Sequence, residues 1–231
     1  MWAIENTREA IWDAMKRKET FATTGPRMKL RFFGGFDFSE ADLGVDLATS
    51  GYQRGVTMGS HMHKAPQGKS PTFMVAAMKD PEGANLDRIQ IIKGWIDRVG
   101  QAHEKVFNVA WSGNRELDAQ GKLSLVGDTV DRDTATYENT IGAAQLAGVF
   151  EDPEFDPENK AVYYVRVLES PTPRWTLYDK VRFGRTDMAD EVPLAQMLPT
   201  AGMKYASKSS SDYTHKRSPP ALTPPLPPRP P

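Results

Sequence analysis

The spacing of apolar and polar residues predicts one helix near the N-terminus. Ile11 and Met15 lie one helical turn apart on the same face, which is typical of a helix that packs against another surface. Asn6, with Glu9 three residues later, fits a capping box at the start of this helix. Residues 23–26 (Thr-Thr-Gly-Pro) end regular structure, because a proline biases the preceding residue away from the helical region.

After residue 27 the pattern changes to short alternations and apolar runs that are typical of strands. Met28, Leu30 and Phe32, for example, alternate with Lys29 and Arg31. The predicted strands span residues 28–32, 73–78, 86–92, 105–111 and 161–168. Short strands separated by regular turn signals favour an antiparallel β-sandwich-like domain, so the expected fold class is α+β, mostly β.

Three internal segments show no strand pattern. Residues 37–70 hold no long periodic run, and we expect a long loop with one short helix, part of which lines a functional surface. Residues 143–150 favour a short helix. Residues 151–158 are acidic and interrupted by prolines, which indicates a loop.

The composition changes sharply near residue 200. Eight of the 18 prolines lie between Pro219 and Pro231. Such a segment buries too little apolar area to offset its ordering entropy, so residues 200–231 are predicted to be disordered or polyproline-like. Residues 224–229 match a ligand of SH3-type domains. A foreign extension translated out of frame would contain the same proline run although the run has no selected function. This is the preferred interpretation.

The overall composition excludes several functional classes. Lysine plus arginine number 29 and aspartate plus glutamate 30, for a net charge of −1. No basic excess is present to neutralise a nucleic-acid backbone, so nucleic acid is not an expected partner. The chain has no cysteine, which rules out disulfides and cysteine-ligated metal sites. The chain contains no long apolar run, so no membrane span is predicted. No signal peptide is evident either, and the localisation is left unknown.

Six ordered sequence blocks resemble a known family. They are ENTREAIWDA (5–14), FATTGPR (21–27), KDPEGANLDRIQ (79–90), VAWSG (109–113), YYVRVLE (163–169) and PTPRWT (171–176). These blocks are similar to the C-terminal region of a bacterial domain-of-unknown-function family that is related to the PHP-type (polymerase and histidinol phosphatase) metallohydrolases. The resemblance covers roughly residues 2–193.

The resemblance implies a longer enzyme of which this chain is a C-terminal fragment, inactive alone. Its N-terminal barrel would bind divalent metal ions and hydrolyse a phosphate or sulfate ester, and the intact enzyme would be a candidate for export to the periplasm. Residues 1–25 would then be the last helix and closing turn of the truncated barrel, and residues 26–195 a β-rich C-terminal domain. Residues 200–231 would be the disordered tail.

Five residues are candidates for the substrate pocket of the intact enzyme. They are Arg27, Lys93, Trp95, Arg174 and Trp175. An arginine can bind an anionic ester through two hydrogen bonds, and a tryptophan can stack on an aryl group. The structural alternative is a surface charge beside a core aromatic.

Two histidines are a weak candidate for a metal site within this chain. His61 and His63 have the H-x-H spacing that puts two imidazoles on one face of a strand, but they lie in a glycine-rich loop, where a solvated pair is the expected alternative. No catalytic residue is assigned. The competing functional class is a non-catalytic β-type ligand-binding or interaction module. The apolar face of the N-terminal helix argues against it, because that face needs a partner.

Overall fold

The computed structural model describes residues 1–44, 46–185 and 200–205, the last of these in backbone only. The strands are β1 (Lys29–Gly35), β2 (Val56–Thr57), β3 (His61–Met62), β4 (Thr72–Met78), β5 (Leu86–Ile96), β6 (Ala102–Trp111), β7 (Gln145–Glu151), β8 (Lys160–Glu169) and β9 (Thr200–Tyr205). The helices are α1 (Arg8–Lys16), the 3-10 helix η1 (Glu40–Leu43), α2 (Leu47–Arg54) and α3 (Trp175–Phe183).

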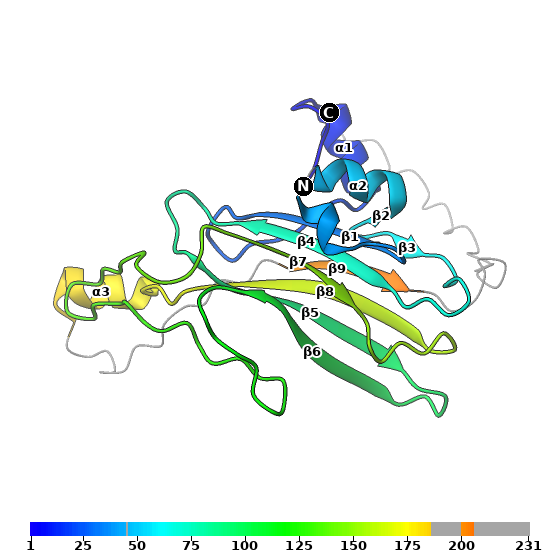
Figure 1. Ribbon diagram of the computed structural model, residues 1–231. Helices are drawn as coiled ribbons and strands as arrows, with labels where there is room; N and C mark the ends of the chain where they lie inside the picture. The colour runs from blue at the N-terminus through cyan, green and yellow to red at the C-terminus, as the bar shows by residue number, and fades with distance from the viewer. Residues whose placement is uncertain (45, 186–199, 206–231) are drawn as a thin grey trace, which may run out of the picture.

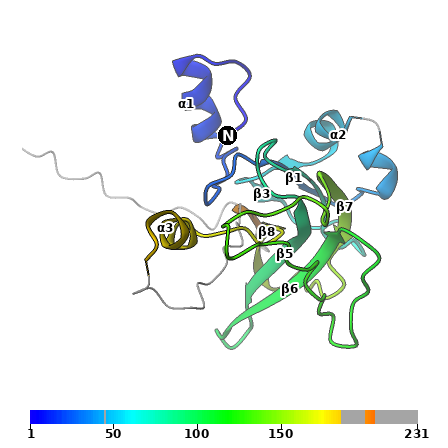
Figure 2. The ribbon, with the colours of Figure 1, turned by 90° about the vertical axis from the view of Figure 1, so that its left-hand side faces the viewer.

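The strands form two sheets that stack as a sandwich (Figures 1 and 2). One sheet has the order β2-β1-β4-β7, and the other has the order β3-β9-β8-β5-β6. All neighbouring strands are antiparallel except the short parallel pair β3–β9. The predicted fold class, mostly β with an antiparallel sandwich, is therefore confirmed.

Large apolar side chains from both sheets fill the space between them. Phe32 and Phe73 come from the four-stranded sheet, and Ile91, Tyr163 and Val165 from the five-stranded sheet, and none of the five is exposed to solvent. The ring centroids of Phe73 and Tyr163 lie 4.5 Å apart, within the range of favourable aromatic pairs. The alternation of buried and half-buried residues along β8 follows from the period of two in a strand.

The helix predicted at residues 143–150 is wrong, because this segment forms strand β7. β7 pairs in register with the whole of β4, from Met78↔Gln145 to Thr72↔Glu151. The pairing turns Leu146 and Phe150 toward the main core. Pairing with a neighbouring strand and burial of one face thus override the local helical preference.

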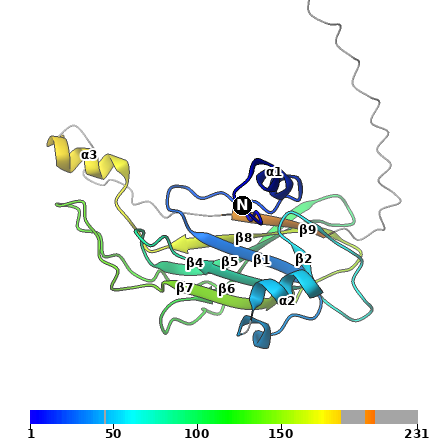
Figure 3. The same ribbon diagram turned by 90° about the horizontal axis from the view of Figure 1, so that it is seen from above.

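Residues 37–70 contain more regular structure than predicted. They include η1, α2, β2 and β3. α2 lies over the four-stranded sheet (Figure 3), where Leu43 and Leu47 pack against Phe33, Phe38 and Met74. η1 and α2 thus cover part of one face of the sandwich, whereas β2 and β3 are edge strands of the two sheets.

The two ends of the chain also differ from the expectations. Thr7, not Asn6, caps α1, because its side-chain oxygen accepts a hydrogen bond from the Ala10 N–H at 3.3 Å. α3 was not predicted. β9 occupies residues 200–205, where the tail was expected to begin. The rest of that tail, with the SH3-ligand motif, lies outside the described residues.

Helix α1 stands clear of the sandwich (Figure 2). Of its residues only Ala10 and Ala14 are buried. Trp12 and Met15 on the helix, and Ile4 before it, are exposed. Exposed apolar side chains gathered on one helix are typical of an interaction surface. No helix in the described part of the chain combines the length and apolar character that crossing a bilayer requires.

The contact between α2 and the sheet provides a test of the fold. A Cβ atom added at Gly51 would overlap the ring of the buried Phe33. Gly51→Ala should therefore destabilise the protein by about 1–3 kcal/mol, although alanine is favoured over glycine in an exposed helix by about 0.5–1 kcal/mol. Urea denaturation would measure the change. Gln53→Ala, at an exposed position of the same helix, is the control, and an equally stable Gly51→Ala protein would contradict the packing.

Candidate functional site

Several family-like sequence blocks meet at one end of the sandwich, which we call the α3 end. Here β5 begins and β6 and β8 end, as the pairs Leu86↔Glu169 and Arg88↔Trp111 show. The turn at residues 79–85 and helix α3 lie at this end (Figure 1). Segments far apart in sequence therefore form one surface, and this surface is the candidate functional site.

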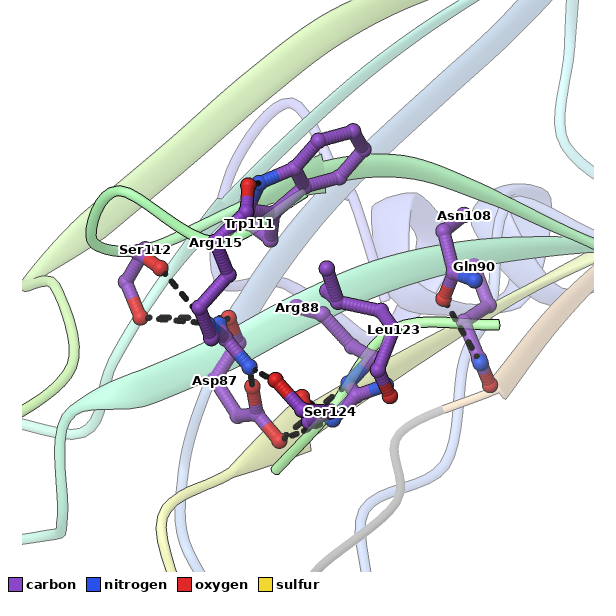
Figure 4. Close-up of polar contacts among 9 residues, drawn as sticks. All are labelled: Asp87, Arg88, Gln90, Asn108, Trp111, Ser112, Arg115, Leu123 and Ser124. Carbon is purple, nitrogen blue, oxygen red and sulfur yellow. Dashed lines mark hydrogen bonds and ion pairs between the residues drawn. The ribbon is translucent and has the colours of Figure 1, made fainter. Parts of the chain in front are cut away.

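A buried ionic network holds this end together (Figure 4). The side chain of Asp87 has no exposed surface. Its Oδ2 accepts hydrogen bonds from Arg88 Nε and Nη2 at 3.2 and 3.0 Å, and its Oδ1 forms an ion pair with Arg115 Nη1 at 2.6 Å. A carboxylate can remain charged inside a protein only where cations and donors replace its water.

The two arginines of this network also bind the chain that follows β6. Arg88 Nη1 donates to the Leu123 carbonyl at 2.7 Å, and Arg115 Nη1 donates to the Ser124 carbonyl at the same distance. Arg115 Nη2 donates to the Asp87 carbonyl at 2.9 Å. The network thus fastens the segment after β6 to the start of β5, and its role is structural.

A second buried carboxylate at the α3 end lacks such partners. Glu169 is 2% exposed and Ser170 is 3% exposed. Glu169 Oε1 and Ser170 Oγ have no hydrogen-bond partner among the described residues. Burial, followed by the negative charge of Asp80, raises the pKa of Glu169 from its ordinary 4.5 to about 8, and Lys79 opposes the rise. Glu169 is therefore protonated at neutral pH and acts as a neutral acid.

The turn before β5 places Arg27 beside Asp80. The backbone N–H of Arg27 donates to Asp80 Oδ2 at 2.6 Å. This bond, followed by one from the Glu82 N–H, holds the pKa of Asp80 below its ordinary value. Lys79 Nζ donates to the Gly83 carbonyl at 2.6 Å and closes the turn. The backbone of Arg27 is thus fixed while its side chain remains exposed.

Arg174 and Trp175 share this end with Arg27. Arg174 is the N-cap residue of α3, and its carbonyl accepts the N–H of Leu177 at 2.9 Å. Its side chain is exposed, and Trp175 is 66% exposed. Leu177 packs with Val130 in a small separate cluster that anchors the helix. Three of the five pocket candidates therefore lie at the α3 end with exposed side chains.

The other two candidates, Lys93 and Trp95, lie toward the opposite end of β5. Lys93 is buried and forms an ion pair with Asp152 at 2.6 Å. Asp152 also accepts a hydrogen bond from the Tyr163 hydroxyl at 2.6 Å. Trp95 packs on the core and stacks on His103, with the ring centroids 5.2 Å apart. The structure does not bring Lys93 and Trp95 together with Arg27.

His61 and His63 are exposed and flank the buried Met62. His61 lies in β3, and His63 follows the last residue of that strand. In the described part of the chain, no three histidine, aspartate or glutamate side chains converge to hold a metal ion.

Sequence reasoning did not identify Glu169 or the Asp87 network. A signal for Glu169 was present, because the residue continues the inward alternation of Tyr163, Val165 and Val167 along β8. A carboxylate at an inward position of a strand is unusual. The partner of Asp87, Arg115, lies far along the chain in a loop, and no periodic pattern points to it.

The comparison with known families identifies the chain. The family described as "Protein of unknown function (DUF3604)" matches residues 1–197. The chain belongs to the DUF3604 family. This match confirms that the sequence blocks belong to a domain family of unknown function, as their resemblance predicted. No curated protein and no solved structure matches it.

The Asp87 network predicts a large loss of stability when its charge is removed. Asp87→Asn leaves two buried or half-buried arginines without their carboxylate and should cost about 3–5 kcal/mol of unfolding free energy. The exposed pair Arg132–Asp128, with its atoms 2.9 Å apart, supplies the control. Asp128→Asn should change stability by less than about 1 kcal/mol. Urea denaturation distinguishes the two, and equal effects would contradict a stabilising role for the network.

The raised pKa of Glu169 predicts a specific pH dependence. Between pH 4.5 and about 8 the unfolded chain loses this proton while the folded protein retains it, so stability should fall as the pH rises through this window. Glu169→Gln should remove this contribution, on the order of 2–4 kcal/mol, and so reduce the fall between pH 5 and pH 8.5. Denaturation of both proteins at each pH is the measurement. The exposed Glu158→Gln is the control, and an unchanged pH profile in Glu169→Gln would overturn the assignment.

Proposed function

We propose that this DUF3604 chain is the β-sandwich portion of a metal-dependent ester hydrolase and contributes to substrate binding at its α3 end. The substrate class is a phosphate or sulfate ester, and the chain is inactive by itself. The observation that carries the proposal is the exposure of Arg27, Arg174 and Trp175 at the same end of the sandwich. Guanidinium groups suit the anionic head of such an ester, and an indole suits an aryl group.

The rigidity of the α3 end supports this role. The Asp87 network, the hydrogen bond from Arg27 N to Asp80 and the anchoring of α3 through Leu177 all fix backbone beneath exposed side chains. Binding groups held on a preorganised backbone lose less entropy when a ligand arrives. The neutral Glu169 lowers the negative charge close to Asp80, which favours an anion nearby.

The metal ions belong to a part of the enzyme other than the described residues. The relation to PHP-type metallohydrolases would place them in a separate barrel, with histidine and aspartate ligands. Such ions activate water and polarise the ester. The exposed apolar face of α1, with Trp12 and Met15, suits contact with such a neighbouring domain. The residues of this chain would bind and orient the ester.

A non-catalytic ligand-binding or interaction module is the second candidate. The closed core between the two sheets favours it, because this core is formed within the chain by residues such as Phe73 and Tyr163. The two proposals differ in what the α3 end does when a catalytic domain is present. Only the hydrolase proposal requires the arginines to affect ester turnover.

The test compares arginine variants in an ester hydrolysis assay. In a longer protein that joins this sequence to the proposed metal-binding barrel, Arg27→Ala and Arg174→Ala should each lower kcat/KM for 4-nitrophenyl phosphate or sulfate. The expected loss is about 10- to 100-fold per arginine, the range of a charged hydrogen bond. Arg98→Ala is the control, because Arg98 is exposed in the turn after β5, at the opposite end of the sandwich.

Measurements on the chain alone separate the two candidates further. The chain should bind the same esters, with quenching of tryptophan fluorescence that Trp175→Leu removes, and it should not hydrolyse them with Mn²⁺ or Zn²⁺ added. Unchanged kcat/KM in both arginine variants would show that the α3 end does not contribute to the substrate pocket. This result would favour the non-catalytic ligand-binding or interaction module. Metal-dependent hydrolysis by the isolated chain would refute the proposal that the metal ions lie in a separate barrel and that this chain only binds the ester.

A further inference from the structure

The outer face of the four-stranded sheet is only partly covered. Over one half, α2 and η1 pack on Phe33, Met74 and Val149. The other half, nearer the start of β1, holds a groove with a volume of about 420 Å³. This volume lies within the range of small-molecule sites. The groove lies on the face of the sheet and does not include Arg174 or Trp175.

The groove has an apolar floor and an aromatic wall. Ala76 on β4 and Ala147 on β7 are paired residues with small side chains, and Met78 continues the floor. Trp2 forms the wall. Its Nε1 donates to the Leu30 carbonyl at 2.7 Å, which holds the indole against β1. An apolar ligand body of a few carbon atoms would thus find a flat surface with a ring beside it.

The charged groups of the groove are all cationic. Lys29 and Arg31 line it, and no aspartate or glutamate does so. Arg31 is held in place, because its guanidinium lies 3.5 Å from the centroid of the Trp2 ring and donates to the Tyr52 hydroxyl at 2.9 Å. Lys29 is exposed and forms no ion pair with any described residue.

We propose that this groove binds a small amphipathic anion. The apolar body lies on Ala76 and Ala147 beside Trp2, and the carboxylate or sulfate head meets Lys29 and Arg31. A guanidinium already held against an aromatic ring loses little freedom when it binds an anion. The proposal does not depend on the hydrolase role of the α3 end, because none of the residues proposed for ester binding takes part.

Calorimetric titration with octanoate tests the proposal, with octan-1-ol and octyltrimethylammonium as probes of charge. Octanoate should bind at least tenfold more tightly than either of the other two. Ala147→Phe should abolish binding by filling the floor, and Lys29→Gln should weaken it about five- to tenfold, as expected for the loss of one charged contact. Ala102→Phe and Lys64→Gln, both at exposed positions outside the groove, are the matched controls and should bind octanoate as the unmodified protein does.

Two results would overturn the proposal. Equal affinity for all three probes would show that charge does not contribute. Octanoate binding that survives Ala147→Phe would place the ligand elsewhere, for example on the exposed Trp12 and Met15 of α1. Circular dichroism of each variant establishes that the sandwich is intact. If Ala147→Phe does not fold, Ala76→Leu, a smaller addition to the same floor, replaces it with the same expected loss.

Discussion

The burial of the Asp87 carboxylate between Arg88 and Arg115 is the constraint on which the α3 end depends. A charge without exposed surface must be matched by cations and donors, because the loss of its hydration is otherwise too costly. The matching cation Arg115 lies in the segment after β6, so satisfying one carboxylate also fixes a long connection on the start of β5. Separate contacts, the hydrogen bond from Arg27 N to Asp80 and the packing of Leu177, hold the backbone near the exposed arginines of the candidate site.

Two carboxyl groups at this end have different protonation states, because their surroundings differ. Asp80 accepts backbone hydrogen bonds at the surface and keeps its charge, whereas Glu169 is buried without a partner on Oε1 and keeps its proton. Because Glu169 is neutral, it adds no negative charge beneath the surface that displays Arg27. The protonation of Glu169 thus affects both the stability of the fold and the charge of the candidate site.

The other candidate binding surfaces lie where the sandwich does not cover its own apolar residues. The core between the sheets is closed, but the face of α1 that carries Trp12 is open, and α2 covers only part of the four-stranded sheet. Exposed apolar area of this kind is costly unless it binds something. The groove differs from the face of α1 because Lys29 and Arg31 add a defined charge, which makes its ligand chemistry more specific.

The sequence by itself determined the fold class, the strands with clear alternation and the family. Strand β8 could be predicted because its inward residues alternate, and the blocks around residues 79–90 and 171–176 carried the family resemblance. Tertiary structure decided what local pattern does not contain. Residues 143–150 became strand β7 because β4 offered a pairing edge, and Lys93 became a buried partner of Asp152. The Asp87–Arg115 pair and the groove over Ala76 and Ala147 join residues from distant segments, so only the packing of the sheets and loops could bring them together.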